Sequence, residues 1–267
     1  MAELDETLEA VEAAMERDDL DEALRLARHA VRDFPTEPDA LLTYGEVLTE
    51  AGDLRAACEA YETATRLAPD DAILWCALAW AEFMLLDFDA ARRDGNRANT
   101  LEATPHGWNL LGRLEEREGR MAEADRCFQR AFALDPESFP LPLRLPEAEF
   151  RDVVAAALDR LPDEFRAALD GEVAVLVEPV PSVDVLQSGD PAFDPEILGL
   201  YVGIALPDRD STQIARLPDV VYLFQRNLEH AAGDREELLD EIAVTVYHEV
   251  GHYLGYDDDE LDEMGIG

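Results

Sequence analysis

Apolar residues recur in the first half of the chain at helical spacing, and the pattern repeats itself. Four alanines mark successive copies at intervals of 34, 34 and 33 residues: Ala23, Ala57, Ala91 and Ala124. Pro35 and Pro69 are also 34 residues apart. A unit of this length with two apolar stripes predicts a pair of antiparallel helices that stacks against the next copy. The first half is therefore predicted to be an array of four helix pairs.

The fourth copy shows most clearly how large and small residues alternate so that two helices can nest. Its spacing residues are Trp108, Leu111, Gly112, Gly119, Ala124, Phe128, Ala131 and Pro136. This pattern resembles the tetratricopeptide repeat over about residues 4–138, most closely at 38–71 and 105–138. The resemblance implies a helical superhelix whose groove holds a peptide or a protein client.

A cluster of prolines ends the repeat pattern. The sequence SFPLPLRLPEAEF, from Ser138 to Phe150, breaks the helical period and indicates a domain boundary. We therefore expect tetratricopeptide-like repeats over residues 1–138, a linker over 139–146 and a second domain over 147–267.

The second domain mixes helical and strand patterns. We expect one or two helices over Phe150–Leu169, broken at Leu161-Pro162, and strands at Glu172–Glu178 and Val220–Phe224. A long helix is predicted over Asp234–Leu254, because acidic residues mark its first turn and Gly255 follows its last.

Composition narrows the classes of partner. There are 61 Asp and Glu residues against 22 basic residues, all of them Arg, for a formal net charge of −39. Such a chain lacks the basic surface that phosphate binding requires, so no nucleic-acid partner is expected. The acidic N-terminus does not resemble an export signal, and the longest apolar stretch, Ala72–Leu86, contains Glu82. It is shorter than the roughly 20 residues of a membrane helix, so we expect a cytoplasmic protein without a membrane partner.

The isolated Cys and His residues are not expected to take part in catalysis or metal binding. Cys58, Cys76 and Cys127 are odd in number and widely spaced, which favours packing roles over disulfides or a cysteine zinc site. The histidines outside the C-terminal motif, His29, His106 and His230, are interpreted as packing or surface residues.

The predicted long helix carries a pattern suited to metal chemistry. His248 and His252 are four residues apart and so share one helix face, where both rings can reach one cation. Glu249 lies at the edge of this face, where it can act as a general base on a water. After Gly255 turns the chain, one of three aspartates can supply a third ligand: Asp257, Asp258 or Asp259. Catalytic zinc takes three such ligands and leaves a fourth position for water.

The motif HExxHxxGxxD, read from His248, is similar to the extended zinc motif of metzincin type. The segments LGLYVGIAL, LPDVVYLFQRNLE and DREELLDEIAVTVYHEVGHYLG add to a resemblance, over about residues 147–262, to the small bacterial zincin-like metallopeptidase family. The resemblance implies an α+β fold with the active-site helix against a small sheet. It also implies that His248, His252 and Asp258 are zinc ligands and that Glu249 is the catalytic base.

The leading hypothesis is a zinc-dependent metallopeptidase acting on a peptide or protein substrate. An interaction scaffold with a metal-stabilised zincin fold is the main alternative, and hydrolysis of a non-peptide amide is a third. A peptidase site usually has a further group that stabilises the oxyanion or the leaving group. Four tyrosines lie near enough in sequence to be candidates, and the sequence does not select among them: Tyr201, Tyr247, Tyr253 and Tyr256.

Overall fold

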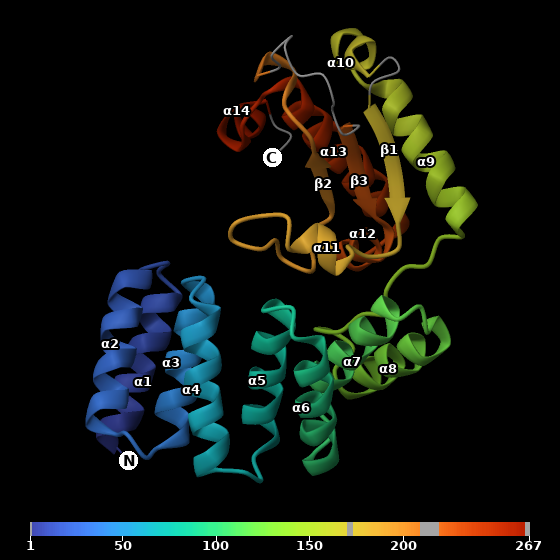
Figure 1. Ribbon diagram of the computed structural model, residues 1–267. Helices are drawn as coiled ribbons and strands as arrows, with labels where there is room; N and C mark the ends of the chain where they lie inside the picture. The colour runs from blue at the N-terminus through green and yellow to red at the C-terminus, as the bar shows by residue number, and fades with distance from the viewer. Residues whose placement is uncertain (1, 170–172, 209–218, 265–267) are drawn as a thin grey trace. The chain divides into compact units, whose positions relative to one another are not determined.

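The computed structural model describes residues 2–169, 173–208 and 219–264. The chain forms two compact units, residues 1–141 and 142–267 (Figure 1). The boundary between them along the chain falls inside the proline-rich segment, and the finer division into 1–138, 139–146 and 147–267 stays a prediction. Among the described residues, no helix combines the length and the apolar character that crossing a bilayer requires.

Over residues 2–134, the first unit consists of four helix pairs in succession (Figure 1). The pairs are α1 (Ala2–Met15) with α2 (Leu20–Asp33), α3 (Pro38–Glu50) with α4 (Leu54–Leu67), α5 (Ala72–Met84) with α6 (Phe88–Leu101), and α7 (Pro105–Arg117) with α8 (Met121–Leu134). The predicted all-helical repeat architecture is therefore confirmed for this unit.

The repeat is built from two features that recur along the first unit: an aspartate at the start of a helix and small residues where the helices of a pair pack closely. The side chains of Asp19, Asp53 and Asp87 each accept a hydrogen bond from a backbone amide in the first turn of the following helix. The four alanines that mark the period are all fully buried. A Cβ at Gly45 would overlap the ring of Tyr61, and one at Gly112 would overlap Phe128. The small residues therefore let the two helices of a pair approach closely.

The second unit places short strands among helices. Its elements are α9 (Glu147–Arg160), α10 (Asp163–Ala168), β1 (Val173–Glu178), α11 (Val183–Leu186), β2 (Gly199–Val202), η1 (Leu206–Asp208), β3 (Asp219–Phe224), α12 (Gln225–Ala231), α13 (Arg235–Leu254) and α14 (Asp258–Glu263). The strand order is β1-β3-β2, with β3 parallel to β1 and antiparallel to β2. This arrangement confirms the predicted α+β fold.

Most of these elements match the sequence prediction. The break at Leu161-Pro162 separates α9 from α10, and β1 and β3 lie within one residue of the predicted strands. Residue 172, the predicted start of the first strand, lies outside the described residues. Strand β2 was not predicted, because four residues that include a glycine give too short a pattern to distinguish from a loop.

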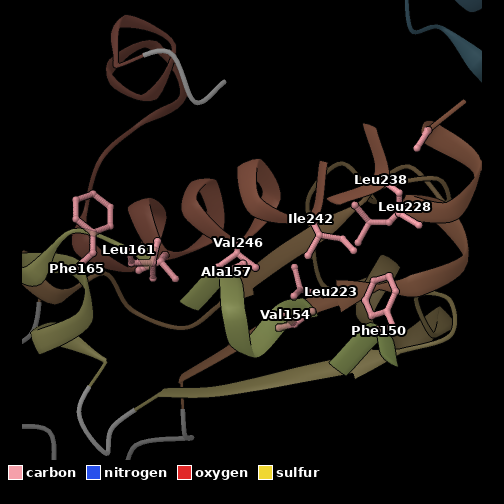
Figure 2. Close-up of a cluster of buried hydrophobic side chains, with 12 residues drawn as sticks. Phe150, Val154, Ala157, Leu161, Phe165, Leu223, Leu228, Leu238, Ile242 and Val246 are labelled. Atoms are coloured by element: carbon pink, nitrogen blue, oxygen red, sulfur yellow. The ribbon is translucent and has the colours of Figure 1, made fainter. Parts of the chain in front are cut away.

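The core of the second unit fixes the position of α13 (Figure 2). Apolar residues four apart on this helix, Leu238, Ile242, Val246 and Val250, are fully buried. They pack with Phe150 and Val154 from α9 and with Leu223 from β3. Each such side chain contributes about 1.5–3 kcal/mol when it is fully removed from water. One face of α13 is thus held against α9 and the sheet, which leaves another face for chemistry.

Both ends of α13 are capped as the sequence predicts. Asp234 accepts hydrogen bonds from the amides of Glu236 and Glu237, at 2.7 and 3.1 Å. Gly255 follows the last turn with a φ of 97°, a left-handed conformation that a residue with a Cβ adopts only with strain. The chain therefore reverses immediately after the helix.

A buried carboxylate fastens the start of the second unit. Glu229 is fully buried on α12 and accepts from the Leu145 amide at 3.0 Å and from Arg144 Nη1 at 3.1 Å. Gln225 Nε2 and Arg226 Nη1 also donate to it, at 2.8 and 2.6 Å. Residues 144 and 145 are thereby tied to α12, although they precede the first helix of the unit.

Candidate metal centre

Two histidines and one aspartate converge on a single point beside the exposed face of α13. His248 Nε2 and His252 Nε2 are 2.9 Å apart. Asp258 Oδ1, at the start of α14, lies 3.5 Å from the former nitrogen and 3.3 Å from the latter. One donor atom from each residue lies within 4.8 Å of the other two. An arrangement of this kind allows three donors to share one cation.

The ring of His252 is oriented by the turn that follows it. Its Nδ1 lies 3.1 Å from the backbone carbonyl oxygen of Tyr256. A tautomer with its proton on Nδ1 donates to that carbonyl and leaves the lone pair of Nε2 directed at the shared point. The Asp258 side chain is 81% exposed, so the point is open to water and to a ligand from solution.

Helix capping distinguishes among the three aspartates. Asp257 accepts from the Glu260 amide at 2.9 Å, and Glu260 Oε2 accepts from the Asp257 amide at 3.1 Å. This reciprocal pair is a capping box at the start of α14. Asp257 is therefore engaged at the helix end, while Asp258, one residue later, faces both histidines. The role of Asp258 as the third ligand stays a prediction, and its carboxylate lies where that role requires it.

Close packing of α14 against α13 explains a glycine inside the long helix. A Cβ at Gly251 would lie 2.5 Å from Cδ2 of Leu261, which is fully buried. Glycine at this position costs about 1 kcal/mol of helix propensity relative to alanine. The sequence leaves open whether substrate approach or helix packing requires it, and the structure supplies a packing contact with Leu261.

Glu249 is a buried carboxylate next to the convergence point. Its exposed fraction is 7%, and the amide of Tyr201 on β2 donates to its Oε2 at 2.6 Å. Burial raises the pKa of Glu249 to about 7, against the opposing effects of His248 and of the Tyr201 amide. A carboxylate with this pKa exchanges a proton readily near neutral pH, as a general base requires.

The four candidate tyrosines have different surroundings. Tyr253 is fully buried and donates its hydroxyl to the Ala168 carbonyl at 3.2 Å. Tyr247 and Tyr256 stack on Phe165, with ring centroids 4.6 and 5.9 Å apart. Tyr201 contacts Glu249 through its backbone amide. Two of the four tyrosines therefore contact a candidate site residue through the backbone: Tyr201 through its amide to Glu249, and Tyr256 through its carbonyl to His252.

Sequence reasoning missed Asp219, the first residue of β3. Its Oδ1 accepts from the Tyr201 hydroxyl at 2.9 Å. It also missed Gly199, where a Cβ would lie 2.8 Å from Cγ of Glu249. Both contacts join residues far apart in sequence, and no local motif marks them.

The isolated Cys residues and two of the isolated His residues belong to the first unit. The three cysteines are free thiols in the first unit. His29 lies 3.3 Å from Asp33 on α2, and the His106 ring contacts Phe139.

Several solved structures are similar to about half of this chain. A crystal structure of MamA is 21% identical, with a TM-score of 0.43, covering 47% of this chain and 74% of its own. A tetratricopeptide repeat protein from Parabacteroides merdae ATCC 43184 is 17% identical, with a TM-score of 0.44 and coverage of 51% and 55%. The APC/C hetero-tetramer Cut9-Hcn1 is 21% identical, with a TM-score of 0.46, over 49% of this chain and 25% of the matched chain. None of the curated proteins matches this chain.

Family models match both units. Residues 14–81 and 105–138 match two models of the tetratricopeptide repeat. Residues 171–267 match the model of the zincin-like metallopeptidase family. The match contains His248, Glu249, His252 and Asp258. The chain therefore carries tetratricopeptide repeats in its N-terminal part and a zincin-like metallopeptidase domain in its C-terminal part.

Proposed function

We propose that the C-terminal domain is a zinc-dependent metallopeptidase, with His248, His252 and Asp258 as ligands and Glu249 as general base. The repeats then recruit or regulate a protein client. The observation that carries this proposal is the convergence of three donor atoms within 4.8 Å beside the buried Glu249 carboxylate. A site that only stabilises the fold has no need of a carboxylate at that place.

The donor set fits zinc. Two imidazole nitrogens and one carboxylate oxygen are ligands that zinc accepts, and three protein ligands are typical of catalytic sites. The bond between His252 Nδ1 and the Tyr256 carbonyl oxygen resembles the outer support usual for ligating histidines. When bound, zinc lowers the pKa of a coordinated water and polarises a substrate carbonyl.

The residues around the centre hold and transfer the proton. Glu249 accepts a proton from the attacking water on one carboxylate oxygen and returns it to the leaving amine. The Tyr201 amide keeps the other oxygen, Oε2, in place at 2.6 Å. Burial of Glu249 keeps competing water away from the carboxylate. The same burial raises the pKa of Glu249 to about 7, which makes this carboxylate a stronger proton acceptor toward the attacking water.

The charge of the chain favours a neutral or basic client. A net charge of −39 repels acidic peptides and attracts cationic ones, an effect that salt screens over a distance of about 10 Å at 0.1 M. Binding of a client by this acidic chain should therefore weaken as ionic strength rises.

A Glu249→Gln substitution in the full chain tests the proposal, with Glu241→Gln on the same helix as the matched control. Glutamine keeps the size of the side chain and leaves both histidines in place. The Glu249 variant should retain one zinc and its melting temperature, while its turnover of a proteome-derived peptide library falls roughly 10²-fold or more. The control should keep its turnover.

The opposite result would be a zinc-loaded wild type that cleaves nothing in a library containing neutral and basic peptides. That outcome would replace the peptidase with an interaction scaffold in which zinc only stabilises the fold.

A further inference from the structure

Asp219 joins strand β3 to strand β2 and to the turn that follows β2. It is the first residue of β3 and is only 5% exposed. One of its carboxylate oxygens, Oδ1, accepts from the Tyr201 hydroxyl at 2.9 Å and from the Ile204 amide at 3.1 Å. Hydrogen bonds to an ionised carboxylate are about twice as strong as neutral ones. Asp219 therefore ties both ends of the segment 201–204 to the central strand.

Tyr201 faces Asp219 and Glu249 through different groups. Strand β2 is at the edge of the sheet, where Tyr201 pairs with Val221 of β3. In an antiparallel ladder, alternate residues direct their amides away from the neighbouring strand. The Tyr201 amide points away from β3 and meets Glu249 Oε2 at 2.6 Å, whereas its hydroxyl meets Asp219.

Strand β2 also lies directly against the catalytic face of α13. A Cβ at Gly199 would lie 2.7 Å from Cγ2 of Thr245 and 2.8 Å from Cγ of Glu249. A sideways movement of this strand would therefore displace the Glu249 carboxylate or release it from the Tyr201 amide. The position of the strand and the orientation of the carboxylate are coupled.

We propose that Asp219 is a positioning residue that acts through Tyr201 to hold the Glu249 carboxylate in its working orientation. This inference rests on the proposed function of Glu249. Asp219 fixes the Tyr201 side chain and the turn after β2, and the Tyr201 amide then binds Oε2 and leaves Oε1 for proton transfer. Misplacement of a catalytic group by about 1 Å can lower a rate by roughly 10²-fold.

Three substitutions in the zinc-loaded full chain, Tyr201→Phe, Asp219→Ala and Gly203→Ala, interrupt this connection without changing Glu249. Tyr201→Phe removes the hydroxyl and keeps the ring. Asp219→Ala removes the acceptor, and Asp219→Asn keeps an acceptor oxygen and serves as the conservative variant. Gly203→Ala adds a Cβ that would overlap both the Asp219 carboxylate and the Tyr201 hydroxyl. Tyr222→Phe, on β3, is the matched control for loss of a sheet tyrosine hydroxyl.

The measurements are zinc content, melting temperature, kcat, KM and hydrogen exchange at the Tyr201 amide. We expect Tyr201→Phe and Gly203→Ala to keep zinc and to speed exchange at this amide about 10-fold, as its hydrogen bond opens more often. Their kcat should fall about 10-fold with little change in KM, because binding groups are untouched. Asp219→Asn should keep the amide protected, whereas Asp219→Ala should not.

Unchanged exchange at the Tyr201 amide in both Tyr201→Phe and Gly203→Ala would overturn the inference. So would a fall in kcat no larger than that of Tyr222→Phe. If wild type shows no peptide turnover, the proposed function fails separately. Amide exchange alone then decides whether Asp219 holds Tyr201 against Glu249.

Discussion

Gly251 of α13 and Leu261 of α14 are in direct contact, with room between them for a hydrogen but not for a methyl group. A Cβ on Gly251 would lie 2.5 Å from Cδ2 of Leu261 and 3.3 Å from its Cδ1. Asp258 precedes Leu261 by one helical turn on the same short helix. The approach of the two helices therefore determines whether the carboxylate reaches the histidines.

Gly251→Ala should weaken metal binding even though alanine favours the helix. The added methyl group pushes against the buried Leu261 side chain, and overpacking of this kind typically costs about 1–3 kcal/mol. The zinc dissociation constant should rise by about 10-fold or more in competition with a chromophoric chelator. The double variant Gly251→Ala/Leu261→Val lacks the clashing Cδ atoms and should recover affinity. Tighter zinc binding by the single variant would contradict this account.

The three neighbouring aspartates should differ sharply in their effect on zinc. Asp258→Ala should lower zinc affinity strongly, because this carboxylate alone of the three contacts both His248 and His252 in the described structure. Asp259→Ala should leave affinity unchanged. Asp257→Asn preserves the cap of α14 and should also bind zinc normally. Titration of each variant with zinc is sufficient, and an equal loss at Asp257 or Asp259 would invalidate the register.

The start point of an isolated C-terminal fragment should decide its stability. A fragment that begins at Pro142 keeps Arg144 and Leu145 on the buried Glu229, whereas one that begins at Glu147 loses both partners. Loss of partners by a buried charge costs about 1–3 kcal/mol. Urea unfolding should show this difference, and both fragments should still contain the zinc ligands. Equal stability would mean that the segment 142–146 is a linker only.

The stability of the repeats should depend on pH through Glu82 on α5. Burial and the neighbouring Asp94 carboxylate raise the pKa of Glu82 to about 8, although Arg93 opposes the shift. The side chain is 13% exposed. Because the pKa is raised in the folded state, its contribution to stability is fully present below about pH 4.5 and is lost as pH rises through 8.

Glu82→Gln removes that titration. The free energy of unfolding of the variant should equal that of wild type near pH 5. At pH 9 it should exceed it by on the order of 1–2 kcal/mol, because Arg93 and solvent offset part of the shift. Glu62→Gln on α4, at a side chain that is 55% exposed, is the matched control. A gain for Glu82→Gln that is the same at pH 5 and pH 9 would contradict the assignment.

Regular patterns made the repeat unit and the long helix predictable from sequence. The recurrence of alanine every 33 or 34 residues determines where helices pair, because only a small residue fits the close contacts. In α13, caps at both ends and histidines four residues apart define the element and the face that carries the donors. These features depend on residues close together in the chain, so a single sequence reveals them.

Contacts between distant segments were not predictable. Strand β2 has four residues, and its role depends on pairing with β3 and on the approach of Gly199 to Glu249. The bond between Tyr201 and Asp219 spans 18 positions with no recurring motif. The three aspartates have the same chemistry; the motif register implies Asp258, and the structure adds that Asp257 is engaged in the capping box of α14. Position in space, and not residue type, separates these cases.

The candidate donors His248, His252 and Asp258 come from eleven consecutive residues at the end of the described chain. An ion held by them closes only a short loop, so it adds little cross-linking to α9 or the sheet. Classical zinc fingers, by contrast, unfold when their metal is removed. Chelation here should instead release α14 alone, while the core around Ile242 and Val246 stays folded. The zincin-like domain would then keep its fold without metal, and only the docking of its last helix would depend on the metal.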